Sequence, residues 1–205
     1  MERSKGSKMV RLIIFLLLFS TIFGCERKAN VVFDNRTSYN LYYTINDMPY
    51  CVAGKHSQKH SFKLGKQYSF YTPDKTLEIT AVGETFLTPN SENGNKRYII
   101  LDKEYYNKDY NLIFYPNRAG FKFINDSNDV IETIQCRKID INGSTLNVLK
   151  RSLNPGEIYW THLEYNNEKT YYYRFEIFLE NDTNIRVIAD SLKLKRDEQL
   201  LYRFY

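Results

Sequence analysis

The sequence has few of the residues from which catalytic and metal sites are usually built. Its 205 residues include three histidines, three cysteines and one tryptophan. It contains no Cys-x-x-Cys pair, no Gly-x-Ser-x-Gly turn and no glycine-rich phosphate loop. These absences remove the sequence support for a thiol-rich metal site, a hydrolase nucleophile elbow and a nucleotide site.

The remaining histidines and carboxylates form no recognisable constellation. His56 and His60 are four residues apart, a spacing that unites metal ligands on a helix, whereas HSQKH is typical of a turn that leads into a strand. The acidic residues are scattered along the chain: Asp74, Glu84, Asp102 and Asp140. We therefore predict no catalytic residue, no metal site and no cofactor. The alternative is an envelope hydrolase that uses carboxylates or the pair His60 and His162 in a cleft between two halves of the chain.

The sequence also lacks an apolar run long enough for a permanent membrane-spanning helix. The longest run, residues 12–23, has 12 residues, whereas a spanning helix needs about 20. Four basic residues precede it: Arg3, Lys5, Lys8 and Arg11. A basic start, a short apolar segment and a small residue at its end are typical of a secretory signal peptide.

The end of this leader has a specific form. Ile22-Phe23-Gly24-Cys25 resembles the lipobox of bacterial lipoproteins. The resemblance implies cleavage between Gly24 and Cys25 and a lipid anchor on the Cys25 thiol. It also implies outer-membrane sorting in a two-membrane bacterium, because Glu26 and not Asp follows the cysteine. The alternatives are an ordinary signal peptide with an incidental cysteine, or a short membrane anchor, and translation could start at Met9.

Charge gives little support for nucleic-acid binding. Removal of residues 1–24 takes away four basic residues and one acidic residue, so the formal charge falls from +5 to +2. No basic stripe and no aromatic RNA-binding motif is left in the remainder. We predict contact with a membrane through the lipid on Cys25, an envelope protein or a glycan as further partner, and no nucleic acid.

The mature chain is typical of β-structure. It contains eighteen tyrosines and ten of the thirteen phenylalanines, which suit pleated, half-buried surfaces, and apolar residues alternate at Leu77, Ile79 and Ala81. Asn142-Gly143 predicts a type I′ hairpin, and residues 154–156 predict a second turn. Residues 190–201, the best helix candidate, are predicted to be strand and turn.

Self-comparison of the sequence indicates a duplication. Three segments recur in the same order, which favours a repeat: 31–43 over 121–133, 51–64 over 152–165, and 76–87 over 184–194. In the first match Phe33 aligns with Phe123 and Asn35 with Asn125. In the third, Leu77 aligns with Ile185.

We therefore predict an all-β protein with two tandem small antiparallel β-sandwich domains, which resemble Ig-like or transthyretin-like modules. The predicted division is a signal peptide (1–24), a short tether (25–30), a first repeat (31–110) and a second repeat (111–205). The boundary lies within 103–118, and residues 110–115 could belong to either repeat. The alternative is one continuous sheet shared by both repeats.

Two further predictions concern pairs and patches of side chains. Cys51 and Cys136 could form a disulfide, or each could be a separate buried thiol. Trp160, Tyr171 and Tyr173 could form an exposed aromatic surface for a glycan or a partner protein, or could simply belong to the wet face of strands. Four Asn-x-Ser/Thr sequences begin at Asn35, Asn125, Asn142 and Asn181, and we interpret them as turn chemistry and not as glycosylation sites.

The sequence as a whole predicts a lipid-anchored extracytoplasmic protein, a non-catalytic interaction or structural module of the cell envelope. The alternatives are the hydrolase described above and an assembly factor or chaperone that uses exposed edge strands to add a strand of a partner.

Overall fold

The computed structural model describes residues 26–66, 74–88, 96–143, 145–168, 170–180 and 184–205. In these ranges the chain forms fourteen strands and one short 3-10 helix, η1 (Lys103–Tyr105). The predicted all-β class is confirmed. No helix in the described ranges is both long and apolar enough to cross a bilayer. The leader, Gly24 and Cys25 lie outside the described residues.

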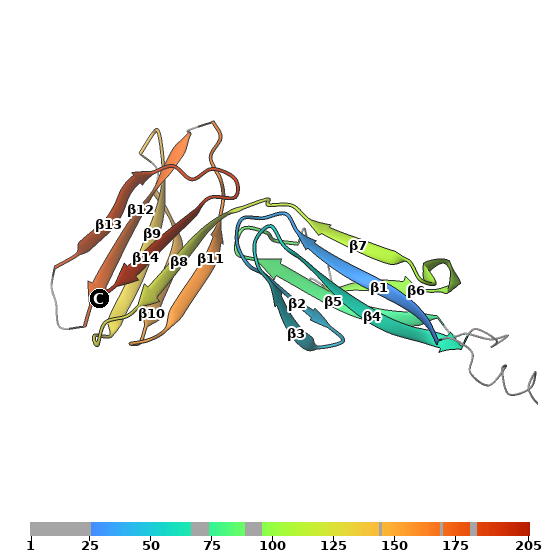
Figure 1. The fold of residues 1–205 in the computed structure, drawn as a ribbon. Coiled ribbons are helices and arrows are strands. Elements are labelled where there is room, and N and C mark those ends of the chain that lie inside the picture. Colours follow the sequence, from blue (N-terminus) through green and yellow to red (C-terminus); the bar gives the residue numbers. More distant parts are fainter. Residues whose placement is uncertain (1–25, 67–73, 89–95, 144, 169, 181–183) are drawn as a thin grey trace, which may run out of the picture.

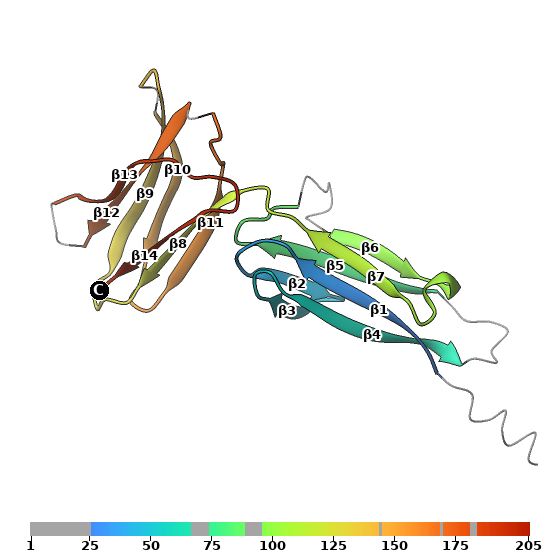
Figure 2. The ribbon, with the colours of Figure 1, turned by 45° about the horizontal axis from the view of Figure 1, so that its top comes forward.

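The first domain is a sandwich of two sheets (Figures 1 and 2). Its strands are β1 (Glu26–Asn35), β2 (Leu41–Ile45), β3 (Met48–Val52), β4 (Ser57–Lys66), β5 (Lys75–Gly83), β6 (Lys96–Leu101) and β7 (Asp109–Phe114). One sheet has the order β4-β1-β7 and the other has the order β3-β2-β5-β6.

The second domain repeats this arrangement strand for strand. Its strands are β8 (Ala119–Asn125), β9 (Ile131–Asp140), β10 (Thr145–Leu153), β11 (Ile158–Leu163), β12 (Tyr171–Leu179), β13 (Arg186–Leu192) and β14 (Gln199–Phe204). The sheet orders are β11-β8-β14 and β10-β9-β12-β13. The prediction of tandem sandwiches is therefore confirmed, and the alternative of one continuous sheet is wrong. Pairing is antiparallel throughout the described strands except between β1 and β7 and between β8 and β14, which run parallel.

The strand equivalence tests the three sequence matches. The first match places β1 on β8, and the second places the β3–β4 turn on the β10–β11 turn, in agreement with the structure. The third match is wrong, because it places β5 on β13 although β5 corresponds to β12. Apolar residues alternate in both candidate strands, so alternation alone does not identify which strand of the second domain is equivalent to β5.

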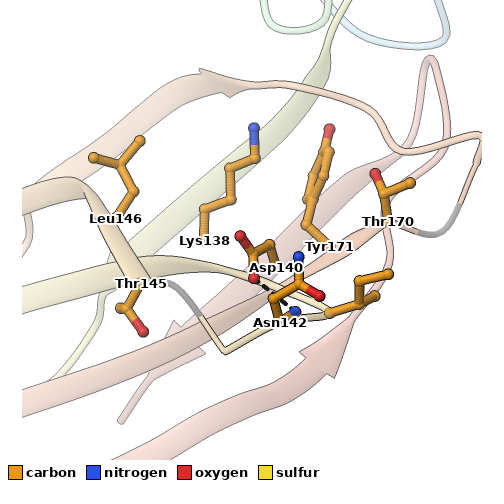
Figure 3. Close-up of a pocket in the computed structure, with 8 residues that line it drawn as sticks. Lys138, Asp140, Asn142, Thr145, Leu146, Thr170 and Tyr171 are labelled. Carbon is orange, nitrogen blue, oxygen red and sulfur yellow. Dashed lines mark hydrogen bonds between the residues drawn. The ribbon is translucent and has the colours of Figure 1, made fainter.

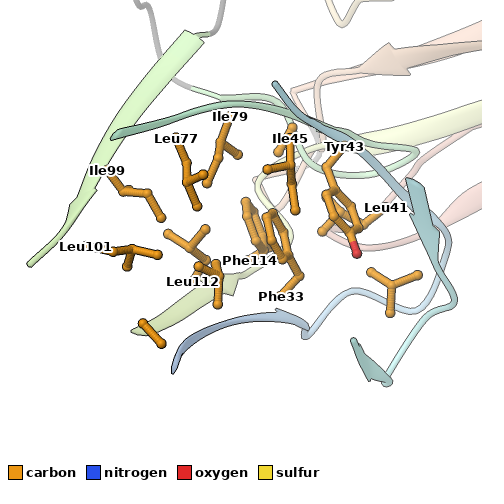
Figure 4. Packing of buried hydrophobic residues seen from close by; sticks show 14 of the residues in the cluster. Phe33, Leu41, Tyr43, Ile45, Leu77, Ile79, Ile99, Leu101, Leu112 and Phe114 are labelled. Atoms are coloured by element: carbon orange, nitrogen blue, oxygen red, sulfur yellow. The ribbon is translucent and has the colours of Figure 1, made fainter. Parts of the chain in front are cut away.

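Each domain has its own apolar core between its sheets. In the first core the Phe33 ring stacks on Tyr43 at 3.8 Å between centroids and lies 6.0 Å from Phe114 (Figure 4). In the second core Phe121 stacks on Phe175 at 4.4 Å. Period-two burial explains why these strands form sandwiches, since one side of each strand points into the core.

Two fully buried asparagines occupy the same corner of the two domains. The Asn35 amide nitrogen donates to the carbonyl oxygens of Tyr39, Val52 and Ala53 at 2.8–3.1 Å. The Asn125 amide donates to Asp129 at 2.9 Å and to Leu153 at 3.4 Å.

The hydroxyl two residues later completes each corner. Thr37 Oγ1 donates to Asn35 Oδ1 at 2.8 Å, and Ser127 Oγ donates to Asn125 Oδ1 at 2.7 Å. Both asparagines are 0% exposed. The interpretation of these two Asn-x-Ser/Thr sequences as turn chemistry is confirmed, because each Ser or Thr holds its own asparagine.

Three predicted boundaries and turns differ from the structure. Strand β1 already begins at Glu26 and Ala29 is 0% exposed, so 26–30 is part of the sandwich and not a tether. A boundary after residue 110 would cut β7, which pairs with β1 and belongs to the first domain. Asn142-Gly143 does join β9 to β10, but only Gly143 has a positive φ (86°), so the turn is not type I′.

The remaining turn predictions agree with the structure. Gly156 has a φ of 78°, and the Glu157 amide donates to the Asn154 carbonyl oxygen at 3.1 Å, which closes the predicted turn. Residues 190–201 are strand, turn and strand, as predicted.

Candidate functional site: the junction between the domains

The predicted aromatic surface is not formed. Tyr173 is 1% exposed because it shares the core face of β12 with Phe175, and its hydroxyl donates to the Glu164 carbonyl oxygen at 2.9 Å. Tyr171 is half-buried and its ring packs edge-on against Tyr173 at 5.6 Å, whereas Trp160 lies at the domain junction. The three rings therefore form no common exposed surface. The phase of β12 could have been deduced from its apolar residues Phe175 and Ile177, which fix Tyr173 inward.

Tyr171 lines an open cavity of about 560 Å³ beside the β9–β10 hairpin (Figure 3). Its ring lies 4.0 Å from Lys138 Nζ, and its hydroxyl donates to the Tyr165 carbonyl oxygen at 2.9 Å. The Lys138 ammonium also pairs with the Glu164 carboxylate. Lys138 and Tyr171 are therefore both engaged in contacts within the domain.

Of the two alternatives for the cysteines, the structure has separate free thiols and not a disulfide, and only Cys136 is buried. Cys51 is exposed on β3 in the first domain, whereas Cys136 is buried in the core of the second. Burial raises the pKa of the Cys136 thiol to about 12. The pKa of Cys51 is also raised, by partial burial and by the negative charge of Glu84. Neither thiol is activated as a nucleophile.

The two histidines of the hydrolase hypothesis do not converge. His60 Nε2 lies 2.7 Å from the Tyr43 hydroxyl and its ring packs edge-on to Tyr50, inside the first sandwich. His162 lies at the junction, with Nε2 2.6 Å from the Gly83 carbonyl oxygen. In strand register His60 corresponds to Thr161 and not to His162, so the two rings lie on opposite faces of equivalent strands.

The strongest concentration of buried polar groups lies at the junction. Glu84 directly follows β5 and is 2% exposed. Its Oε1 accepts hydrogen bonds from Lys122 Nζ at 2.9 Å and from the Tyr42 hydroxyl at 3.0 Å. Its Oε2 accepts one from Gln199 Nε2 at 2.9 Å. Because Lys122 and Gln199 come from the second domain, this carboxylate joins the two sandwiches.

The approach of the domains is close enough to require a glycine. A Cβ added at Gly120 would lie 2.8 Å from the Glu84 carbonyl oxygen, which is nearer than packed atoms come. Gly120 and Lys122 share the outer face of β8. One strand therefore supplies both the glycine that permits close approach and the cation that pairs with Glu84.

A second carboxylate holds the other side of the junction. Asp197, in the β13–β14 turn with a φ of 63°, accepts hydrogen bonds from the Ser38 hydroxyl at 2.7 Å and the Thr85 hydroxyl at 2.6 Å. The Ser38 amide donates to the same carboxylate at 2.9 Å, and Lys55 Nζ lies 3.7 Å away. Asp197 thus caps a loop of the first domain.

Aromatic packing and the linker complete the contact. Trp160 stacks on Tyr42 with centroids 5.8 Å apart. In the linker, the Asn117 and Arg118 amides both donate to the Thr85 carbonyl oxygen, at 3.1 and 3.0 Å. Burial raises the pKa of Tyr42, and the adjacent Glu84 charge acts in the same direction. The Tyr42 phenol therefore stays protonated and remains a hydrogen-bond donor.

The junction has the properties of a fixed joint. Each charged group named here has a partner, and the carboxylates accept hydrogen bonds from both sides of the interface. Among the described residues, no group of three or more His, Cys, Asp or Glu is placed to hold a metal ion. These contacts hold the two sandwiches in one relative orientation.

Sequence reasoning missed this site. Glu84 was noticed only as one of several scattered carboxylates, and its partners Lys122 and Gln199 are 38 and 115 residues away. The sequence around Glu84 contains no signal for the site, because an acidic residue is common in the turn after a strand.

No family model matches the chain, and no curated protein matches it. Among solved structures it is similar to the TIE protein of Bacillus anthracis, with 9% identity, 87% of this chain covered and a TM-score of 0.29. The chain spans about a third (34%) of that protein's length.

Two other solved structures are similar over most of the chain. A fimbrial assembly protein from Parabacteroides distasonis has 8% identity, covers 87% of this chain and 91% of its own, and has a TM-score of 0.29. The major pilin protein T-13 of Streptococcus pyogenes has 8% identity, covers 88% and 97%, and has a TM-score of 0.26. At TM-scores below 0.5 these similarities carry no argument about what this chain binds or does.

Proposed function

We propose that this protein is a lipid-anchored extracytoplasmic lipoprotein whose two sandwiches form a non-catalytic interaction or structural module of a bacterial cell envelope. The observation that carries the proposal is the lipobox-like segment Ile22-Phe23-Gly24-Cys25, which precedes the described sandwiches in the sequence. The described core begins at Ala29, four residues after Cys25. Cleavage before Cys25 would therefore remove no residue of either described core.

The junction supports the structural part of the proposal. A module that presents a surface from a membrane benefits from a fixed relation between its parts, because each flexible joint adds conformational entropy that a partner must remove on binding. The carboxylates of Glu84 and Asp197 supply such a joint from opposite sides of the interface. Both are fully engaged within the protein, which suits a structural role better than a catalytic one.

The test is metabolic labelling of cells with a radioactive fatty acid. We expect label in the full-length protein and none in the Cys25→Ser variant, together with a mass for the mature product that starts at Cys25 and carries acyl chains. A mature product with an unmodified thiol, or with an intact Met1 or Met9, would contradict the anchor. Cys51→Ser is the matched control, because Cys51 is exposed but lies within the first domain, and it should label fully.

A further inference from the structure

The end of the first domain where β1 begins, here called the basal end, gathers segments from several elements. It consists of the starts of β1 and β5, the end of β4, η1 and residues 107–108. The Asn107 amide donates to the Lys28 carbonyl oxygen at 2.7 Å, and the Asn30 amide donates to Lys108 at 3.1 Å. In Figure 1 this end lies on the side of the first domain away from the second domain.

Basic side chains predominate at the basal end. They come from five separate positions of the chain: Arg27, Lys28, Lys63, Lys75 and Lys108. Four acidic residues with described side chains lie in or next to these segments: Asp74, Asp102, Glu104 and Asp109. Asp102 caps the Glu104 amide at 2.8 Å, and Asp109 pairs with Lys59 at 2.8 Å. Lys28, Lys63 and Lys108 have exposed side chains.

The charge of the mature chain is unevenly divided between the domains. Residues 26–114 contain 12 basic and 10 acidic residues, whereas residues 115–205 contain 13 of each. The whole positive excess of the mature chain thus lies in the first domain, to which the basal end belongs.

Aromatic rings accompany these cations. The Arg27 guanidinium lies 4.5 Å from the Tyr106 ring centre, and Lys75 Nζ lies 5.2 Å from that of Phe62. Tyr105 packs against Tyr110 at 5.1 Å. Tyrosine and the long stems of Lys and Arg are the side chains that suit the headgroup region of a bilayer, since each combines an apolar body with a polar end.

The chain leaves no spacer between this surface and the predicted anchor. Cys25 is one residue before β1, and consecutive Cα atoms are about 3.8 Å apart. Acyl chains on Cys25 would hold that residue at headgroup level. The Cα atoms of Arg27 and Lys28 would then lie about 7 Å and about 10 Å from it along an extended chain, close to the screening length of about 8 Å at physiological salt.

We propose that the basal end docks on an anionic phospholipid surface, with Lys28 and Lys108 facing the headgroups. This inference rests on the proposed lipid anchor and deepens it, because the anchor then fixes an orientation as well as a location. The first domain stands on the bilayer, and the junction holds the second domain away from it.

Vesicle flotation of residues 26–205, which contain every described strand and no acyl chain, tests the proposal. The probes are vesicles of phosphatidylcholine alone and of phosphatidylcholine with phosphatidylglycerol. We expect binding to the anionic vesicles only, weakened by salt. The double variant Lys28→Glu/Lys108→Glu should bind at least tenfold more weakly, since each basic residue near such a surface contributes about 1 kcal/mol.

The matched control is Lys150→Glu/Lys193→Glu, which changes the net charge equally at exposed positions of the second domain. It should bind within about twofold of the unchanged protein, and thermal melting should confirm that both variants fold. Equal losses in both variants, binding unaffected by the basal substitutions, or equal binding to neutral vesicles would each overturn the proposal. The result is independent of acylation, because the tested chain lacks Cys25: absence of label on Cys25 would refute the anchor alone, and absence of vesicle binding by the unchanged chain would refute the docking alone.

Discussion

The two domains have the same topology, yet equivalent faces of their three-stranded sheets differ in chemistry. On the outer face of β4-β1-β7, Asn30, Ser61 and Asp109 lie in one row, linked by hydrogen bonds of 2.7 Å. The equivalent row on β11-β8-β14 is Gly120, His162 and Gln199.

The first row satisfies itself, whereas the second reaches across to the other domain. Lys59 also binds Asp109, at 2.8 Å, so the polar side chains of this row are already paired within the first domain. In the second row, Gly120 permits close approach while His162 and Gln199 bond to the first domain. The comparison teaches that topology provides the face, and that a few side chains decide whether the face stays in water or packs against a neighbour.

The largest expected effect tests the equivalence of the cores. Phe33→Ala and Phe123→Ala each remove a fully buried ring at matching positions. Each should destabilise its own domain by about 4 kcal/mol, because the cavity remains as well as the lost burial. Hydrogen exchange read by mass spectrometry resolves the domains separately. Tyr115→Ala, at a 64% exposed ring, is the control and should change little; a loss confined to one of the two phenylalanine variants would contradict the equivalence.

The corner asparagines should reveal a difference in degree. Asn35→Ala removes three hydrogen bonds to backbone carbonyl oxygens, and Asn125→Ala removes two. Tyr39 and Ala53 each keep a second donor, Thr37 Oγ1 and the His56 amide. We expect losses of about 3 and about 2 kcal/mol in the free energy of unfolding, because each lost hydrogen bond of a buried group contributes about 1 kcal/mol. Chemical denaturation measures both. Asn111→Ala, at an exposed asparagine of β7, provides the comparison, and the proposed corner role fails if this control costs as much.

A smaller effect concerns the junction. Lys122→Met leaves the Glu84 carboxylate without its cation, and since the Lys122 side chain is 22% exposed we expect a loss of about 2 kcal/mol. Trp160 is the single tryptophan and stacks on Tyr42, so its fluorescence reports directly on the junction.

In this variant the Trp160 transition should precede the far-ultraviolet circular dichroism transition, whereas both should coincide in the unchanged protein. Glu84→Gln combined with Lys122→Met removes both charges and should recover part of the loss. Coincident transitions in Lys122→Met would argue against a joint that depends on this ion pair.

The smallest effect concerns pH and only the first domain. Burial lowers the pKa of His60, so the unfolded chain binds the proton more readily than the folded chain. Folding therefore favours the neutral form of His60. The free energy of unfolding is at its full value above the unfolded pKa of about 6.5, and it decreases as the pH falls below that value.

Hydrogen exchange at pH 7.5 and 5.5 should show this decrease in β1 and β2, with β12 of the second domain as internal reference. Thr161 occupies the equivalent position there. In the His60→Gln variant, the two domains should show the same change in hydrogen exchange between the two pH values. If the first domain still changes more, another titrating group causes the effect.

The sequence by itself determined the class of the fold and part of its symmetry. Alternating apolar residues specified strands, and the recurring Asn-x-Ser/Thr corner aligned β1 with β8, because both signals act between residues that are close in the chain. The leader likewise depends on a contiguous segment, and the lipid on Cys25 stays a prediction.

Only the tertiary structure decided which strands pair, that β7 closes the first domain and that Tyr173 points inward. It alone brought Glu84 to Lys122 and Asp197 to Ser38. The physical reason is that these contacts join side chains whose positions depend on the packing of whole sheets. No local pattern encodes a partner 38 or 159 residues away.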